Sequence, residues 1–269
     1  MKFEDYKKSH LCSLLHQTEQ SQTFTINVNG EKRVIKKYPN EFDRLKEELA
    51  YRYVKSFDLL KVPELISNGE DFVEMEFLDS IGTPSIEEVI KDISNMYLGS
   101  DGLEAEEYFP RIDLSKDKIY KRLLYIPNEL EKRGFLEKGL VNSIERFTNE
   151  YYSYSESGCL VHGDLKMPHI IKTKKGIFFI DLALTSIANP WYDLAFLYME
   201  KRERDRFRQL VDSSFNIISR EFKVNKNETE VFLTSSIFYR SLYDVIFASR
   251  HRSDKVLART IKDLKEILK

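Results

Sequence analysis

Two aspartates in the second half of the chain are residues that could do chemistry. Asp164 ends the tripeptide His-Gly-Asp, and Asp181 follows the apolar run Ile-Phe-Phe-Ile. An aspartate after a glycine most often forms a turn. Asp181 is harder to explain in this way, because a carboxylate behind an apolar run would be partly buried and would need a partner.

A lysine and a glutamate in the first half could complete a site for phosphoryl transfer. That reaction needs a cation on the nucleotide phosphates, a carboxylate near the attacking hydroxyl and carboxylates that hold Mg²⁺. Lys36 ends a predicted strand, and Glu47 follows eleven residues later on a predicted helix. Each also fits a structural interpretation: a lysine that closes a strand is usually exposed at its edge, and Glu48 could serve as well as Glu47.

The first 78 residues predict a small α+β arrangement that would position Lys36 and Glu47. Asn29-Gly30 between two alternating apolar runs is a strong hairpin signal. Leu11, Leu14 and Leu15 predict an amphipathic helix over 5–17. After the hairpin, the pattern predicts a helix over 42–57, with apolar residues at 42, 45, 49, 53 and 57, and strands over 64–67 and 71–78.

The rest of the chain is predicted to be mostly helical, with one island of strand around the two aspartates. Residues 84–158 have a helical pattern that is broken near 99–102 and 127, and about four helices are expected from 191 onward. The island comprises strands over 159–162, 170–173 and 177–180. We therefore expect a nucleotide-binding lobe over 1–78, joined directly to a helical lobe over 79–269 that carries the catalytic loop and the metal-binding hairpin.

The composition favours a globular protein with no affinity for nucleic acid or membranes. Charged residues make up 32% of the chain and aromatic residues make up 13%. This aromatic content is too high for a disordered protein. A net charge of −2 gives no overall attraction to nucleic acid or anionic lipid. No apolar run approaches the roughly 20 residues that span a bilayer, and two cysteines give neither a disulfide framework nor zinc spacing. We expect a cytoplasmic protein that is a monomer or a weak dimer.

These motifs resemble the aminoglycoside phosphotransferase and choline kinase family, distant relatives of protein kinases. The resemblance lies in "HGD" at 162–164, in Ile180-Asp181 after a hairpin, and in "NPWYDLA" at 189–195. Upstream, "KEELAYRYV" is similar to the family's glutamate-bearing helix, and "VEMEFLD" is similar to its hinge strand. The resemblance implies a bilobal protein-kinase-like α+β fold, with a small antiparallel-sheet N-lobe carrying one helix and a larger helical C-lobe.

The same resemblance implies roles for individual residues. Asp164 would be the catalytic base or would orient the hydroxyl, and Asp181 would be the principal Mg²⁺ ligand. Lys36 and Glu47 would form the ion pair that positions the phosphates, which favours Glu47 over Glu48. Lys166 matches a lysine that protein kinases direct at the transferred phosphate, although a solvent-facing Lys166 is an equal alternative.

The resemblance also implies roles for the backbone of two residues and for one residue of the "NPWYDLA" motif. The backbone of Glu76 and Leu78 would meet the adenine. Asp193 would brace the catalytic loop from the first turn of a helix.

Three features depart from the family pattern. The first turn, residues 18–24, has no glycine, and Ser21 is the best candidate there for a hydroxyl or backbone contact with the phosphates. Leu184 and Asn189 replace carboxylates that are frequent in the family. His169 stands where an asparagine usually supplies a metal ligand, and histidine suits softer metals better than Mg²⁺, although some family members also have histidine at this position.

The predicted function is transfer of the γ-phosphate of ATP or GTP, with Mg²⁺, to a hydroxyl of a small molecule. The acceptor classes in the family are aminoglycosides, sugars, choline and amino alcohols. Two alternatives stay open. One is a protein kinase, since "HGDLK" is similar to that family's "HRDLK", although no Asp-Phe-Gly or Ala-Pro-Glu segment follows. The other is an inactive nucleotide-binding pseudokinase.

Overall fold

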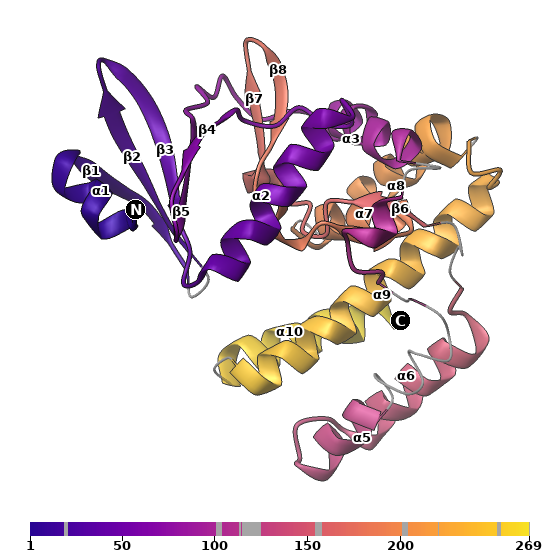
Figure 1. The fold of residues 1–269 in the computed structure, drawn as a ribbon. Helices are drawn as coiled ribbons and strands as arrows, with labels where there is room; N and C mark the ends of the chain where they lie inside the picture. The colour runs from indigo at the N-terminus through magenta and orange to yellow at the C-terminus, as the bar shows by residue number, and fades with distance from the viewer. Residues whose placement is uncertain are drawn as a thin grey trace. The chain divides into compact units, whose positions relative to one another are not determined.

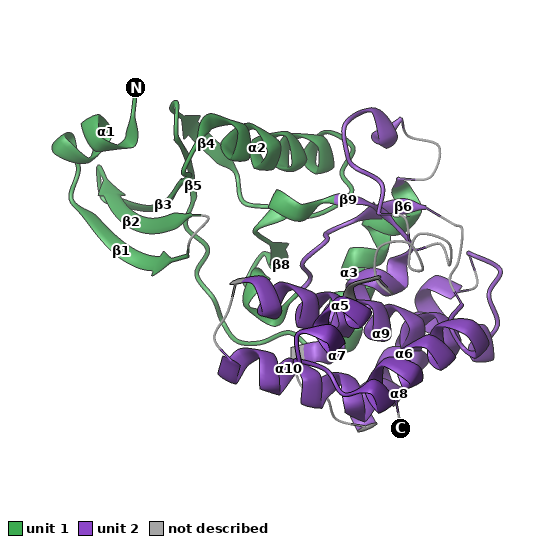
Figure 2. Cartoon of the chain, turned by 90° about the horizontal axis from the view of Figure 1, so that it is seen from below, with its two compact units in different colours: residues 1–99, 166–185 green, residues 100–165, 186–269 purple. Residues whose placement is uncertain are grey.

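The computed structural model describes residues 1–18, 21–100, 104–112, 114, 125–153, 158–200, 204–219, 221–251 and 254–268. The chain divides into two compact units (Figure 2). One comprises residues 1–99 and 166–185, and the other comprises residues 100–165 and 186–269. The predicted boundary at residue 78, between the nucleotide-binding lobe and the helical lobe, remains a prediction. It depends on which residues bind nucleotide, whereas the two units are defined by how the chain packs.

The first unit is built on a five-stranded antiparallel sheet (Figure 1). Its strands are β1 (Cys12–Gln17), β2 (Gln22–Val28), β3 (Glu31–Lys37), β4 (Leu65–Asn68) and β5 (Phe72–Glu76), in the order β1-β2-β3-β5-β4. The predicted Asn29-Gly30 hairpin is confirmed: both residues have positive φ, 54° and 87°, as a two-residue turn between twisted strands requires. The hairpin sets the register that places Lys36 opposite Thr23.

The predicted lead-in helix over 5–17 is wrong in its second half. Helix α1 spans only Phe3–Ser9, and residues 12–17 form strand β1, which pairs with β2. The helix buries Phe3 and Tyr6 instead of the leucines, and Leu11, Leu14 and Leu15 are exposed. Backbone hydrogen bonding to the neighbouring strand therefore decides the structure here, against the helical spacing of the leucines.

Helix α2 (Glu41–Ser56) confirms the predicted helix, but most of its predicted apolar stripe is exposed, and only Tyr53 of that stripe is buried. Asn40 caps the helix by accepting a hydrogen bond from the backbone N–H of Asp43 at 2.9 Å. Phe42, Leu45 and Leu49 are exposed. The buried face carries several charged and aromatic side chains, which are Arg44, Glu47, Glu48, Tyr51 and Tyr53.

The predicted strand island is divided between the units: its hairpin before Asp181 belongs to the first unit, and its strand over 159–162 belongs to the second. Strands β7 (Ile170–Thr173) and β8 (Gly176–Phe179) form the predicted hairpin, between the 3₁₀ turns η3 (Met167–His169) and η4 (Leu182–Leu184). The backbone N–H of Phe179 donates to the Lys61 carbonyl at 2.9 Å, and that of Ile81 donates to the Lys172 carbonyl at 2.8 Å. These bonds attach the hairpin to the segments before and after β5. Helix α3 (Ile86–Gly99) lies in the same unit.

The second unit is mostly helical. Its helices are α5 (Tyr125–Lys132), α6 (Lys138–Glu150), α7 (Pro190–Glu200), α8 (Arg204–Ser214), α9 (Lys226–His251) and α10 (Asp254–Ile267), with a 3₁₀ turn at Ala105–Glu107 and a π-helical turn at Phe215–Ser219. Residues of α5, α6, α9 and α10 share one apolar core. The described residues from 190 onward form helices α7, α8, α9 and α10, in agreement with the expectation of about four helices. No helix in the described ranges is both long and apolar enough to cross a membrane.

A short two-stranded sheet in this unit was only half predicted. Strand β6 (Cys159–Val161) pairs antiparallel with β9 (Ser186–Ala188). The sequence analysis identified β6 but missed β9, because three residues are too few to show a period. The pairing brings the residues after β6, which include Asp164, close to the start of α7.

Candidate active site

Lys36 lies on β3 with its ammonium group bound to two carboxylates. Its Nζ lies 2.9 and 2.7 Å from the two carboxylate oxygens of Glu47, and 2.7 Å from Oδ1 of Asp181. An ammonium group has three N–H donors, so each has an acceptor here. The side chain of Lys36 is 11% exposed and that of Glu47 is fully buried. Lys36 is therefore not an exposed edge lysine.

The two carboxylates keep Lys36 charged. Burial lowers the pKa of Lys36, but the charges of Glu47 and Asp181 more than offset this effect, and the pKa stands above its usual value. A buried cation that stays charged at neutral pH suits the binding of phosphate groups, which carry the opposite charge.

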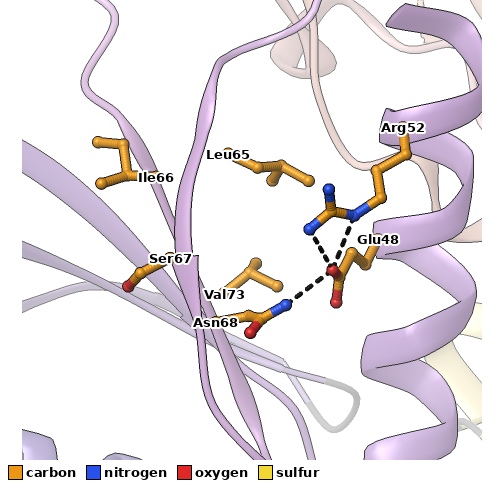
Figure 3. Close-up of a pocket in the computed structure, with 7 residues that line it drawn as sticks. All are labelled: Glu48, Arg52, Leu65, Ile66, Ser67, Asn68 and Val73. Carbon is orange, nitrogen blue, oxygen red and sulfur yellow. Dashed lines mark hydrogen bonds and ion pairs between the residues drawn. The ribbon is translucent and has the colours of Figure 1, made fainter. Parts of the chain in front are cut away.

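The structure also separates Glu47 from its neighbour Glu48. Figure 3 shows the Oε1 atom of Glu48 accepting hydrogen bonds from Arg52 and Asn68, at 2.7–2.9 Å. Its other oxygen accepts a bond from Arg44. Glu48 lines a pocket of about 190 Å³ between α2 and β4, whose lining includes neither Lys36 nor Asp181. Glu47 therefore pairs with Lys36, while Glu48 joins α2 to the edge of the sheet.

Asp181 stands two residues after the end of β8, in a left-handed backbone conformation with φ of 63° and ψ of 57°. Aspartate enters this region more readily than most residues, but non-glycine residues there mark a constrained position. The backbone N–H of Asp181 donates to the hydroxyl of Tyr51 at 3.0 Å. Its carboxylate is 39% exposed, so one side stays accessible while Lys36 holds the other.

Sequence analysis did not identify Tyr51. This side chain is almost fully buried, and its hydroxyl fixes the backbone of Asp181. The sequence contained one indication of its role: Tyr51 lies four residues after Glu47, which puts both side chains on one face of α2.

His169 lies beside Asp181. Its Nε2 atom is 3.3 Å from Oδ2 of Asp181, and its side chain is 17% exposed. The carbonyl of His169 accepts a hydrogen bond from the N–H of Ile180 at 2.9 Å, and this bond ties η3 to the end of the hairpin. An imidazole nitrogen and a carboxylate oxygen at this separation are ligand types that can hold a divalent cation.

In the second unit, Asp193 fixes the loop that contains Asp164. The two carboxylate oxygens of Asp193 accept hydrogen bonds from the backbone N–H groups of His162 at 2.7 Å and Gly163 at 2.8 Å. Asp193 is fully buried in the first turn of α7. The predicted bracing of the loop at 162–164 by Asp193 is confirmed. Asp164 follows this bound pair and is half-buried.

Asn189, which departs from the family pattern, has a structural role. It is buried, and its Oδ1 atom accepts a hydrogen bond from the backbone N–H of Tyr192 at 3.0 Å. The amide thus satisfies one of the N–H groups at the start of α7, a role that an aspartate fills equally well.

The remaining predicted residues lie at the edges of these elements. The N–H of Ser21 donates to Oγ1 of Thr18 at 3.0 Å, and the two residues between them lie outside the described part of the chain. Glu76 ends β5, and its N–H donates to the Glu64 carbonyl at 3.0 Å. Leu78 and Lys166 are both half-buried, the first after β5 and the second before η3.

A sequence model of the phosphotransferase enzyme family matches residues 102–216 of the chain. This segment contains Asp164, Asp181 and Asp193. The predicted family resemblance is confirmed. A curated relative, the "Protein LicA homolog" of Mycoplasma capricolum subsp. capricolum, is 21% identical over 177 residues, which is 63% of this chain and 70% of the relative.

Solved structures of such enzymes share the fold. The GDP complex of aminoglycoside 2'-phosphotransferase-IIIa matches 96% of this chain and 92% of its own, with a TM-score of 0.70 and 16% identity. Macrolide 2'-phosphotransferase type I also has a TM-score of 0.70, at 13% identity, with coverages of 96% and 93%. Choline kinase from Cryptosporidium parvum has a TM-score of 0.67, at 13% identity, with coverages of 97% and 89%. The predicted kinase-like α+β fold is confirmed.

Proposed function

We propose that this protein transfers the γ-phosphoryl group of ATP or GTP to a hydroxyl of a small molecule. The observation that carries the proposal is the position of the Lys36 ammonium, held by buried Glu47 on one side and accessible Asp181 on the other. Phosphoryl transfer depends on such positioned charges more than on covalent chemistry by the protein. Similar structures named as complexes with GDP and with ADP support a purine nucleotide as donor.

In the proposed reaction, the acceptor oxygen forms a bond to the γ-phosphorus. The bond from this phosphorus to the β–γ bridging oxygen breaks, and the nucleoside diphosphate leaves with that electron pair. Asp164 orients the acceptor hydroxyl and takes up its proton, which then passes to solvent. Lys166 would add a positive charge near the transferred group.

Residues of the first unit would hold the nucleotide. Lys36 would bind phosphate oxygens, and Glu47 would keep its ammonium in place. Ser21 would contact the phosphates through its hydroxyl or backbone. The backbone of Glu76 and Leu78 would meet the purine, and at Glu76 the contact falls to the carbonyl, since the N–H is bound to Glu64.

Asp181 and His169 fit a divalent cation, which we propose to be Mg²⁺. The carboxylate of Asp181 keeps an accessible side, and its Oδ2 atom lies 3.3 Å from the His169 ring nitrogen. When bound, the metal would neutralise charge on the phosphate oxygens. Carboxylate oxygen suits Mg²⁺ better than imidazole nitrogen does, so Asp181 would be the principal ligand.

Nucleotide consumption tests this proposal. Purified protein is incubated with Mg²⁺ and ATP or GTP against a panel of aminoglycosides, sugars, choline and amino alcohols, and nucleoside diphosphate is measured. Asp181→Ala should abolish consumption and Mg²⁺-dependent nucleotide binding, whereas Asp79→Ala, at an exposed aspartate of the same unit, should change neither. Substantial turnover by Asp181→Ala would contradict the metal role. Tight nucleotide binding with no consumption for any acceptor would favour the pseudokinase alternative.

A further inference from the structure

Arg240 on α9 lies between aromatic rings that the proposed reaction does not use. Its Cζ atom is 4.3 Å from the centre of the Phe196 ring and 5.4 Å from that of Tyr243. At these distances the positive charge of the guanidinium is attracted to the ring faces. Phe196 is buried on α7, so the arginine lies at the contact between α7 and α9.

The guanidinium retains donors for a ligand. Its Nη2 atom lies 2.9 Å from Oδ1 of Asp244, one helical turn along α9, and the Arg240 side chain remains 19% exposed. The hydroxyl of Tyr192 also forms a hydrogen bond with this side chain. An arginine has five N–H donors in a planar fork, so one carboxylate and one hydroxyl do not use them all. Asp244 and the rings therefore fix the orientation of the fork without enclosing it.

The cluster adjoins the residue that holds the catalytic loop. The Tyr192 ring lies 5.4 Å from the Phe196 ring and 6.2 Å from the Tyr239 ring, in edge-to-face geometry. Burial raises the pKa of Tyr192, and Arg240 only partly offsets this, so the hydroxyl is neutral beside the guanidinium. Tyr192 directly precedes Asp193, which binds the backbone of His162 and Gly163. Arg240, α7 and the Asp164 loop all belong to the second unit.

An aromatic cluster next to a catalytic loop could hold a cationic acceptor, but here the protein's own arginine occupies it. A second cation would meet like charge, whereas an anionic group would meet oriented donors. We propose that the acceptor is a small hydroxylated compound carrying a carboxylate or a phosphate, which Arg240 binds while the hydroxyl faces Asp164. This inference rests on the proposed phosphotransferase function.

A matched acceptor series tests the charge preference. Glycerate, glycerol 3-phosphate, glycerol and choline are compared for binding by calorimetry and for nucleotide consumption in the presence of Mg²⁺. The two anions should bind at least about tenfold more tightly than glycerol and choline, because one charged hydrogen bond contributes about a factor of ten to affinity. Comparing the two anions shows which group the site takes. Equal or tighter binding of choline, or no binding of either anion, would overturn the inference.

Variants at Arg240 and Asp244 separate ligand binding from a structural role. Arg240→Gln should weaken binding of the anions at least about tenfold and leave that of glycerol unchanged, while Arg240→Lys should retain part of the preference. Arg250→Gln, at an exposed position on the same helix, is the control for net charge. Asp244→Asn should tighten anion binding, because a competing carboxylate is removed. If Arg240 has a purely structural role, Asp244→Asn will not tighten anion binding, and that result would refute the inference.

Failure of this inference differs from failure of the proposed function. If choline or glycerol is phosphorylated in preference to the anions, the phosphotransferase stands and the anionic acceptor is wrong. If the anions bind through Arg240 but Mg²⁺ and nucleotide do not bind at all, the anion site stands and the phosphotransferase is wrong.

Discussion

The Nζ atom of Lys36 lies 2.7 Å from Oδ1 of Asp181, although the two residues are 145 positions apart in the sequence. The contact joins the middle of the sheet to the end of the β7–β8 hairpin. Because Glu47 binds the same ammonium, three residues from three elements share one buried charge. In the proposed function, a nucleotide phosphate that binds Lys36 would therefore compete with Asp181, and Glu47 would keep the lysine in place during the exchange.

Lys36→Met should destabilise the protein in a pH-dependent way. Breaking a buried ion pair by removing one partner costs roughly 3–5 kcal/mol. Burial raises the pKa of Glu47, and Lys36 opposes this rise, so the pKa should be higher in the variant. A raised folded pKa stabilises the protein at low pH, and this contribution is lost as pH rises through it. Urea unfolding of the variant should therefore show a smaller free energy of unfolding at pH 8 than at pH 5.

The control for this prediction is the double variant Lys36→Met with Glu47→Gln. The neutral amide cannot titrate, so the additional pH dependence should disappear. If Lys36→Met lowers the free energy of unfolding equally at pH 5 and pH 8, then the carboxylate that the variant leaves unpaired is not Glu47.

Glu47→Gln should chiefly reduce activity, whereas Glu48→Gln should chiefly reduce stability. Glu47→Gln should reduce nucleotide consumption by about tenfold or more, because one charged hydrogen bond to Lys36 is worth about 1.5–3 kcal/mol. Glu48→Gln should leave consumption nearly unchanged but lower the melting temperature, because Glu48 joins Arg44, Arg52 and Asn68. Melting curves and steady-state kinetics of the two variants distinguish them. A larger loss of activity from Glu48→Gln would reverse the assignment.

Local patterns predicted the parts of the fold that local interactions determine. The Asn29-Gly30 turn, α2 and the β7–β8 hairpin depend on turn chemistry and periodicity, which are visible in the sequence. The start of the chain was mispredicted because strand β1 is held by pairing with β2, and its leucines remain exposed. Strand β9 was missed because its three residues are too few to show a period, and its pairing with β6 is visible only in the folded chain.

The candidate site shows a similar division. Lys36, Glu47 and Asp181 were identified from residue type and order, and the family resemblance added their roles and Asp193. The structure gives each a specific partner. Tyr51 was not assigned a role, because its importance depends on which side chains surround it after folding. Arg240 was singled out only together with Arg250, His251 and Arg252, as basic residues that could favour an anionic acceptor. A tyrosine or an arginine on a helix gives no indication in the sequence of which side chains will surround it.

Asp193→Asn should disturb the catalytic loop while leaving nucleotide affinity unchanged. The carboxylate accepts two backbone hydrogen bonds in a fully buried position, whereas the amide directs an N–H donor at one of them. The loss should cost about 1–3 kcal/mol of stability and reduce kcat. Calorimetric titration with Mg²⁺ and nucleotide, together with kinetics, measures both effects. An unchanged kcat would show that the loop does not depend on this brace.

Asp164→Asn should keep nucleotide binding and reduce turnover by about 10²–10⁴-fold, the range for a lost acid–base group. The variant keeps the shape of the side chain but cannot take up the acceptor proton. Single-turnover measurements with preloaded nucleotide isolate this step from binding. If nucleotide affinity falls while turnover of the bound complex persists, Asp164 has been assigned the wrong role.

His169 variants should distinguish a metal ligand from a packing residue. If His169 holds the metal with Asp181, His169→Asn should keep most activity, because an amide oxygen has a similar reach and suits Mg²⁺ better than imidazole does. His169→Leu should lose most turnover and should require more Mg²⁺ for half-maximal nucleotide binding. Circular dichroism should be unchanged in both variants, since the backbone bonds of His169 to Lys166 and Ile180 do not involve the ring. Replacing Mg²⁺ by Mn²⁺, which accepts nitrogen ligands more readily, should benefit the wild type more than His169→Asn. Near-normal turnover in both variants, with the same Mg²⁺ requirement, would leave the metal on Asp181 and make His169 a structural residue of the loop.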